Sequence, residues 1–231
     1  MSSRDAILAR IRAALHSSDE EDDPRRVAVS ARLDFPPRGV IPARGQLGHA
    51  AQIKLFRKMA ESAAASVDRA SSPKDVPKLV SAYLRKHNLG ARLRMGGDKR
   101  LRAIPWVEER TLQVTIGPSD GAHEVAVSHA AAAIAESGTV ALTSGRDNPT
   151  TLNFLPEHHI VIVNTEDITG DMETMLDRLR DRHGKGKMPR TLNFITGPSR
   201  SGDIEQTLLL GAHGPRALHI IIVGGTSAAG D

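Results

Sequence analysis

Two short runs of the chain are almost wholly apolar, His159-Ile-Val-Ile-Val163 and Leu218-His-Ile-Ile-Ile-Val223. β-Branched residues dominate both, and neither alternates apolar with polar residues as a strand with one solvated face does. Strands buried on both faces have this composition, because helices cover each side of a parallel sheet. The two runs therefore predict an α/β fold, a mostly parallel open sheet covered by helices.

The segments around these runs extend the same pattern. Further strands are expected at residues 66–70 (a short exposed strand or turn), 91–95, 112–116, 125–128, 139–143 and 192–195. Apolar residues recur at helical spacing in residues 49–65, 72–88 and 169–182, which predicts three helices, and residues 99–109 are expected to form a short helix or loop around the single Trp106. No internal repeat is visible, so residues 49–231 are expected to form one α/β domain.

Residues 1–48 have a different composition and are predicted to form an N-terminal arm. Residues 3–16 carry apolar side chains at helical spacing, whereas residues 17–48 contain an acidic run and several prolines and are interpreted as an irregular linker. An amphipathic helix on such a tether docks on a partner or on a second copy of the chain, or it packs on its own domain. The sequence leaves both alternatives open.

Composition limits the classes of function. The 231 residues include 3% aromatic residues and carry a net charge of +4, which disfavours a stacking platform for single-stranded nucleic acid and fits an acidic small molecule or partner equally well. The chain has no cysteine, so disulfides, thiolate-bound iron–sulfur clusters and a cysteine nucleophile are excluded. No signal-peptide pattern or membrane-length apolar run is visible, and a cytoplasmic location is expected.

The stretch Gly197-Pro-Ser-Arg-Ser-Gly-Asp-Ile-Glu205 is the first candidate binding site. It follows an expected strand and precedes residues 206–210, which are interpreted as a helix. A strand–turn–helix unit of small residues gathers backbone N–H groups that favour an anion. The side chains expected to contribute are Ser199, Arg200, Ser201 and Asp203. The alternative is a capped strand–helix turn that binds no ligand.

A second polar turn, Ser144-Gly-Arg-Asp-Asn-Pro-Thr-Thr151, follows the expected strand at residues 139–143. Ligands of open α/β sheets bind at the carboxyl ends of strands. The candidate ligand-binding residues in this turn are Ser144, Arg146, Asn148, Thr150 and Thr151. Alternatively, Thr150 or Thr151 only caps a one-turn helix.

Three further candidates are weighed against structural roles. Glu136, just before a glycine and an expected strand, could act as a nucleophile or general base, but a loop glutamate that caps a helix or pairs with an arginine is the favoured interpretation. His213 and Arg216 either face a binding cleft or line a helix C-terminus. His158 and His159 are neighbours on an expected strand and point to opposite faces, so no metal site is predicted.

The chain contains four linked motifs, Ala135-Glu-Ser-Gly-Thr139, Pro149-Thr-Thr-Leu-Asn-Phe-Leu-Pro156, Gly197-Pro-Ser-Arg-Ser-Gly-Asp-Ile-Glu205 and Gly211-Ala-His-Gly-Pro-Arg-Ala-Leu-His219. Together they resemble the lactate utilization protein C family, also called the LUD domain family. The resemblance implies a NagB/RpiA/CoA-transferase-like fold and a role in bacterial growth on L-lactate beside two iron–sulfur partner proteins. It implies no catalytic residues, and the acidic, proline-rich segment departs from the family pattern.

Two main hypotheses follow. In the first, the chain is a non-redox subunit or accessory protein of a system that oxidises L-lactate to pyruvate; it binds a small anion and holds no cofactor, and iron–sulfur clusters are expected only in the partner proteins. In the second, it is an independent enzyme that transfers CoA, acyl or phosphate-ester groups and uses Glu136. Nucleic-acid binding through the basic residues between Arg85 and Arg102 is a weaker third hypothesis, since no recognition element accompanies them. Membrane binding is not expected, and a homo-oligomer could form through the arm.

Overall fold

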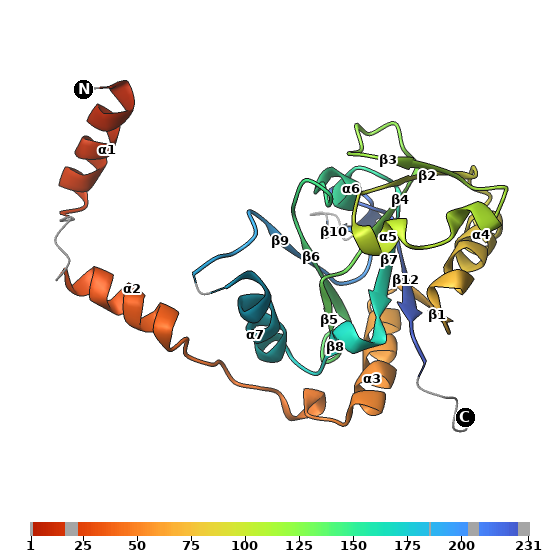
Figure 1. The fold of residues 1–231 in the computed structure, drawn as a ribbon, viewed down its shortest axis with the longest axis horizontal. Coiled ribbons are helices and arrows are strands. Elements are labelled where there is room, and N and C mark those ends of the chain that lie inside the picture. The colour runs from red at the N-terminus through yellow and green to blue at the C-terminus, as the bar shows by residue number, and fades with distance from the viewer. Residues whose placement is uncertain (1, 17–22, 185, 203–207, 226–231) are drawn as a thin grey trace. The chain divides into compact units, whose positions relative to one another are not determined.

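The computed structural model describes residues 2–16, 23–184, 186–202 and 208–225. The chain divides into two compact units, Met1–Gly39 and Val40–Asp231 (Figure 1). No helix in these described ranges is long and apolar enough to cross a membrane.

The first unit contains two helices. Helix α1 (Ser3–Ala14) begins at a capping box formed by Ser2 and Asp5. Helix α2 (Pro24–Asp34) begins where Asp23 accepts a hydrogen bond from the backbone N–H of Arg25, with proline in the first turn. The prediction of an irregular linker was therefore wrong over residues 24–34. Asp23, at the end of the acidic run, acts as the helix N-cap, and Pro24 occupies the first turn. A composition rich in acids and prolines was interpreted as a linker, although both residue types also occur at helix starts.

The second unit is built on a six-stranded sheet in which every described strand pair is parallel. In sheet order its strands are β1 (Ser66–Ala70), β12 (Ala217–Val223), β7 (His158–Asn164), β4 (Val125–His129), β2 (Arg92–Met95) and β3 (Gln113–Ile116). This arrangement confirms the predicted α/β class, with β7 and β12 paired near the middle (Figure 1).

Two of the predicted strands belong to a separate sheet. It contains β8 (Ile168–Thr169), β5 (Ala132–Ile134), β6 (Thr139–Thr143) and β9 (Leu192–Ile195), and its β5–β6 and β6–β9 pairs are antiparallel. A short hairpin of β10 (Arg200–Gly202) and β11 (Leu208–Leu210) follows. The turn at residues 135–138 joins β5 directly to β6, which leaves no room for the crossover that a parallel pair needs.

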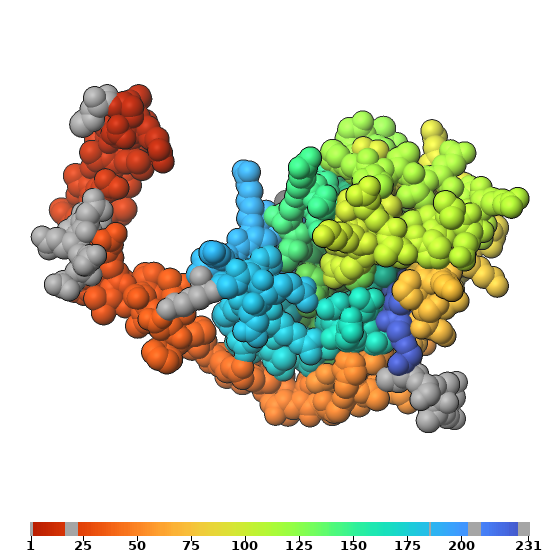
Figure 2. All heavy atoms as spheres, in the orientation of Figure 1, coloured from red at the N-terminus to blue at the C-terminus, as the bar shows by residue number. Residues whose placement is uncertain are grey.

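The helices of this unit are α3 (His49–Ser62), α4 (Val76–Lys86), α5 (Lys99–Arg102), α6 (Thr151–Phe154) and α7 (Met172–His183). Four 3-10 turns accompany them: η1 (Ala43–Gly45), η2 (Pro73–Asp75), η3 (Trp106–Glu108) and η4 (Thr165–Asp167). Helix α3 packs on β8 and β1, and the space-filling view shows it in contact with the residues around β8 (Figure 2). Helix α7 packs on β5.

The side chains of β7 and β12 pack in two separate hydrophobic cores. Val161, Val163, Ile220 and Ile222 pack in a cluster with residues of α3, whereas Ile160, Ile162, Ile221 and Val223 pack in a cluster with residues of α4. Because alternate side chains of a strand point to opposite faces, α3 and α4 cover opposite sides of the sheet. The continuous apolar runs at 159–163 and 218–223 are thereby explained.

His159 is fully buried in β7 and is held in its neutral form. Its Nε2 lies 2.9 Å from Oγ of Ser128, whose hydroxyl donates to Oδ1 of Asn153, so Nε2 of His159 carries the proton. Burial lowers the pKa of His159 to about 3. Its Nδ1 is buried with no partner among the described residues.

The low pKa of His159 predicts acid destabilisation. Below pH 6.5 the unfolded chain binds a proton here that the folded chain does not bind, so the free energy of unfolding falls as pH drops from 6.5 towards 3, by at most about 1.4 kcal/mol per pH unit. His159→Gln keeps an N–H donor for Ser128 and removes the titration. Urea unfolding from pH 7 to 4 is expected to show a shallower pH dependence for this variant than for the wild type. Equal slopes for His159→Gln and wild type would contradict this explanation.

Gly138 ends the turn between β5 and β6 and lies against the backbone of α3. Its φ is +68°, and an added Cβ would collide with the backbone of Met59 and Ala60. Gly138→Ala is therefore expected to lower the free energy of unfolding by more than about 2 kcal/mol. Gly121 also has a positive φ but faces open space. The loss of unfolding free energy in Gly121→Ala therefore measures the cost of backbone strain alone, without a collision. Similar losses for both variants in urea unfolding would show that the contact with α3 is unimportant.

Candidate functional site

The stretch after β9 does not form the predicted strand–turn–helix unit. The chain turns at Gly197, with φ +73°, and Arg200–Gly202 then pairs as β10 with β11, antiparallel. The helix predicted at residues 206–210 was wrong, because Leu208–Leu210 is a strand. A short apolar run has no periodicity that separates a helix from a strand, and pairing with β10 decides the outcome. The described residues of this stretch, 197–202 and 208–210, therefore offer no helix N-terminus to an anion.

Side chains of this stretch bind neighbouring backbone. Nη2 of Arg200 donates a hydrogen bond of 2.9 Å to the carbonyl of Ala63, the C-cap residue of α3. This contact places a cation at a helix C-terminus, where it is favoured. The Ser199 backbone bonds to Pro215 and Gly211. Ser201 lies in β10, and Asp203 lies outside the described residues. Anion binding by these side chains stays a prediction.

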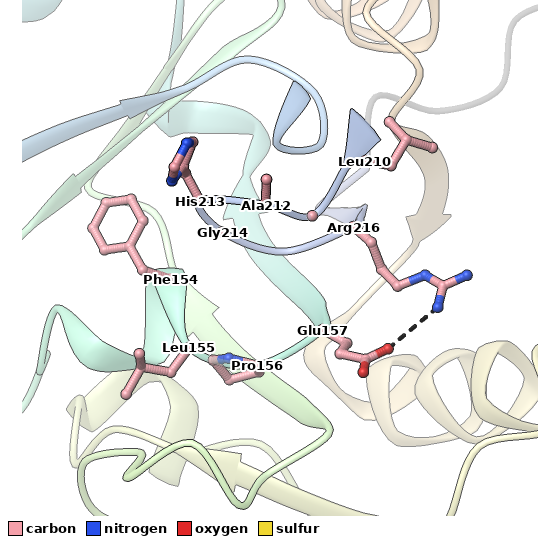
Figure 3. A pocket seen from close by; sticks show the side chains of 10 residues that line it. Phe154, Leu155, Pro156, Glu157, Leu210, Ala212, His213, Gly214 and Arg216 are labelled. Carbon is pink, nitrogen blue, oxygen red and sulfur yellow. Dashed lines mark hydrogen bonds and ion pairs between the residues drawn. The ribbon is translucent and has the colours of Figure 1, made fainter. Parts of the chain in front are cut away.

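His213 and Arg216 line one cavity of about 520 Å³ (Figure 3). One wall is the segment from Phe154 to Glu157, which leads into β7, and the other is the segment from Leu210 to Gly214 together with Arg216. The close-up shows His213 near the Phe154 end, while Arg216 points to Glu157 (Figure 3). Arg216 Nη1 and Glu157 Oε2 are 3.4 Å apart and both side chains are more than half exposed, so their pairing contributes little stability.

Glu136 lies in the turn between β5 and β6 and is buried. Its Oε1 accepts a hydrogen bond of 3.1 Å from the backbone N–H of Met172, the first residue of α7. Its backbone N–H donates to the carbonyl of Gly170. This is the helix-capping arrangement that the sequence favoured. Oε2 is buried and has no partner among the described residues.

The side chains of the polar turn after β6, residues 144–151, contact several different partners and do not form one cluster. Ser144 Oγ accepts from the backbone N–H of Thr191, and Thr151 Oγ1 accepts from that of Ser119. Arg146 is exposed, and Thr150 precedes α6 without a side-chain cap. Asn148 bonds to a charged side chain instead of backbone, because its Nδ2 donates to Oδ2 of Asp98 at 3.2 Å.

Asp98 is the centre of a charged cluster beyond the end of β2. Its carboxylate accepts hydrogen bonds from the backbone N–H of Arg100 at 2.9 Å and from Nε and Nη2 of the same side chain at 3.1 and 2.9 Å. Burial opposes ionisation, but these bonds and the charge of Arg100 outweigh it and lower the pKa of Asp98 to about 2. Nη1 of Arg100 also donates to the carbonyl of Ala130 beyond β4. The guanidinium therefore links two strand ends.

A smaller cavity of about 230 Å³ lies beside this cluster, at the carboxyl edge of the parallel sheet. His129 ends β4, Asn164 ends β7 and Val223 ends β12. The complete lining is Pro73, Arg100, Ala103, Ile104, His129, Ile162, Asn164 and Val223. The chain runs from β2 outwards to β3 but from β4 towards β7 and β12, so the winding reverses between β2 and β4, whose ends Arg100 links. Such reversal points are where open α/β sheets bind ligands.

His129 is the one titratable base in this lining, and its tautomer is fixed. Its Nδ1 lies 2.8 Å from the carbonyl of Ala130, which only accepts, so Nδ1 carries the proton and Nε2 keeps its lone pair. Burial and then the charge of Arg100 lower the pKa of His129, so the neutral ring is favoured. An oriented neutral imidazole can accept a ligand's hydroxyl proton.

The sequence did not identify this second cavity. The expected strand at residues 125–128 stopped one residue before His129, and Arg100 fell in a segment without a clear pattern. The available signal was the position of polar residues directly after apolar strands, at His129 and Asn164. Which of them converge depends on the strand order, which the sequence did not provide.

Comparison with curated proteins finds relatives named "Lactate utilization protein C". The chain is 35% identical over 100 residues to that of Shouchella clausii (43% of this chain and 44% of the relative). It is 42% identical over 91 residues to that of Geobacillus sp. strain WCH70 (39% and 38%) and 41% identical over 91 residues to that of Bacillus subtilis (38% and 38%). The matched segment thus spans about two fifths of the length of these relatives.

A solved structure supports the fold. A DUF162 family protein from Deinococcus radiodurans superposes with a TM-score of 0.56 at 21% identity, covering 77% of this chain and 99% of that chain. Residues 53–223, which include the whole six-stranded sheet and both cavities, match the LUD domain. The chain therefore belongs to the LUD domain family.

Proposed function

We propose that this chain is a non-redox subunit or accessory protein of a bacterial L-lactate utilization system, in which lactate is oxidised to pyruvate. The observation that carries this proposal is the similarity to proteins named lactate utilization protein C, at 35–42% identity in the three comparisons above. Membership in the LUD domain family supports it over a longer part of the chain.

Electron transfer is assigned to partner proteins. The sequence contains no cysteine, and thiolates hold most iron–sulfur clusters. The proposal therefore locates the clusters in other proteins of a cytoplasmic system, and this chain binds the small acid or supports the assembly.

The N-terminal unit is the proposed contact with such a partner. Neither α1 nor α2 buries a residue. Both helices expose apolar side chains at helical spacing, among them Ile7 and Ile11 of α1 and Val29 and Leu33 of α2. A surface of this kind gains free energy when another protein, or a second copy of the chain, covers it.

Deletion of the gene in its own host tests the role. The strain is expected to lose growth on L-lactate and to keep growth on pyruvate, the oxidation product, and the wild-type gene is expected to restore growth. The tagged chain, purified from lactate-grown cells, is expected to bring down proteins that contain iron and acid-labile sulfide, whereas the isolated chain oxidises no lactate with a dye acceptor. Lactate consumption at the wild-type rate in the deletion strain would refute the proposal.

A second candidate function is an independent transferase that uses Glu136. The buried Oε2 has no partner in the described part of the chain, and this observation favours the transferase, since a helix cap needs only one of the two oxygens. The hydrogen bond to Met172 favours the capping role instead, and fold analogy alone is a poor guide to activity.

Substitution of Glu136 separates the two roles. Glu136→Gln retains an oxygen for the Met172 N–H and removes a charge at the start of α7, so a loss of about 0.3–1 kcal/mol in unfolding free energy is expected. Glu136→Ala removes the acceptor of the Met172 N–H, whereas the N-cap Asp171 remains, and should cost about 1–2 kcal/mol. With capping as its role, Glu136→Gln restores growth on lactate in the deletion strain. A folded Glu136→Gln protein that fails to do so, together with CoA binding by the wild type, would favour the transferase.

A further inference from the structure

We propose that the cavity at the carboxyl edge of the sheet binds a short 2-hydroxy monocarboxylic acid, with its carboxylate on Arg100 and its hydroxyl on Nε2 of His129. The choice of this chemical class rests on the proposed function, whereas the site itself rests on the geometry of the cavity. The inference concerns binding and assigns no chemical step to the chain.

Arg100 is oriented in advance for a carboxylate. A guanidinium has five N–H donors; Nε and one N–H of Nη2 are bound to Asp98, and one N–H of Nη1 is bound to the carbonyl of Ala130. Three committed donors leave two, one on each terminal nitrogen. Because Asp98 and Ala130 hold the side chain, the ligand does not have to order it on binding.

The balanced charge around Arg100 disfavours a ligand with more than one negative charge. Asp98 bonds to Arg100, and Asp167 lies 3.9 Å from Arg100 and 3.4 Å from Arg182. Two carboxylates thus balance two guanidinium groups. A monocarboxylate gains two directed N–H bonds here, whereas a doubly charged phosphate meets the nearby Asp98 and Asp167 without a surplus of positive charge.

His129 supplies the selectivity for a hydroxyl. Its side chain is 5% exposed and lines the cavity, and the Nδ1 bond to Ala130 leaves Nε2 as an acceptor. A ligand hydroxyl satisfies that lone pair, while an acid without the hydroxyl leaves it unpaired in a buried place. A site that bonds a ligand hydroxyl therefore discriminates against the analogue that lacks it.

The remaining walls fit a short alkyl group. Ile104, Ile162 and Val223 are each at most 5% exposed and offer only apolar atoms. At about 230 Å³ the cavity is smaller than the usual range for drug-sized ligands, which favours a ligand of a few heavy atoms. A carboxylate, an adjacent hydroxyl and a methyl group match the guanidinium, the imidazole and this apolar wall.

The fluorescence of Trp106 can report ligand binding near Arg100 in the full chain. Trp106 is the only tryptophan, and its Nε1 donates to the carbonyl of Leu101, next to Arg100 on α5. Fluorescence of Trp106 and isothermal titration calorimetry are recorded with L-lactate, with propionate, which lacks the hydroxyl, and with inorganic phosphate. L-lactate is expected to bind at least about tenfold more tightly than propionate or phosphate.

Variants locate the binding in the cavity. Arg100→Lys keeps the charge but not the fork and should weaken L-lactate binding at least about tenfold. His129→Gln should weaken L-lactate binding and leave propionate unchanged. Ala103→Leu fills the cavity from its exposed rim without touching the Asp98–Arg100 bonds, so it tests the site even if Arg100→Lys fails to fold. His213→Leu, in the cavity of Figure 3, is the matched control and should bind as the wild type does.

Two outcomes would overturn the inference: no L-lactate binding by the folded wild-type chain, or binding that His213→Leu weakens and Ala103→Leu does not. Failure here is distinguishable from failure of the proposed function. If the deletion strain cannot grow on lactate but the chain binds no lactate, only the inference falls. If Ala103→Leu abolishes binding while the deletion strain grows normally, only the proposed function falls.

Discussion

The pairing of β7 with β12 is the constraint on which the structure depends. These two parallel strands send alternate side chains into a core under α3 and a core under α4, so both faces must be covered before either strand is stable. Because the strands of the sheet run the same way, their carboxyl ends meet at one edge. His129, Asn164 and the Asp98–Arg100 cluster are brought together by this geometry although they lie far apart in the sequence.

Charged side chains near the sheet mainly form hydrogen bonds with backbone groups and ion pairs with one another. Glu136 accepts from the first residue of α7 and Arg200 donates to the carbonyl of the C-cap residue of α3, so each complements a helix end. Asp98 holds Arg100, and the pair joins the ends of β2 and β4. The first two groups stabilise helices, whereas the third leaves guanidinium N–H groups beside a cavity. That difference, rather than charge alone, separates a structural contact from a candidate binding site.

The second sheet explains why the family motifs do not form one site. Glu136 and Gly138 join β5 to β6 and pack against α7 and α3, while the motif at residues 197–202 turns into a hairpin beside the cavity of Figure 3. Asn148, which directly precedes the second motif, donates to Asp98 at the carboxyl edge. The second and fourth motifs supply most of the lining of the cavity in Figure 3, whereas the polar groups that converge on the smaller cavity come from segments outside the motifs.

Local composition was sufficient to predict the α/β class, because the apolar runs at 159–163 and 218–223 are rich in β-branched residues, as strands covered on both faces are. It also identified the motifs of the family and the capping role of Glu136. Only the tertiary structure decided that residues 208–210 pair as a strand, that residues 24–34 form a helix, and that Arg100 meets His129 at a strand-order reversal. A short apolar run fits either secondary structure, and the strand order arises from contacts between distant segments, which a local pattern does not encode.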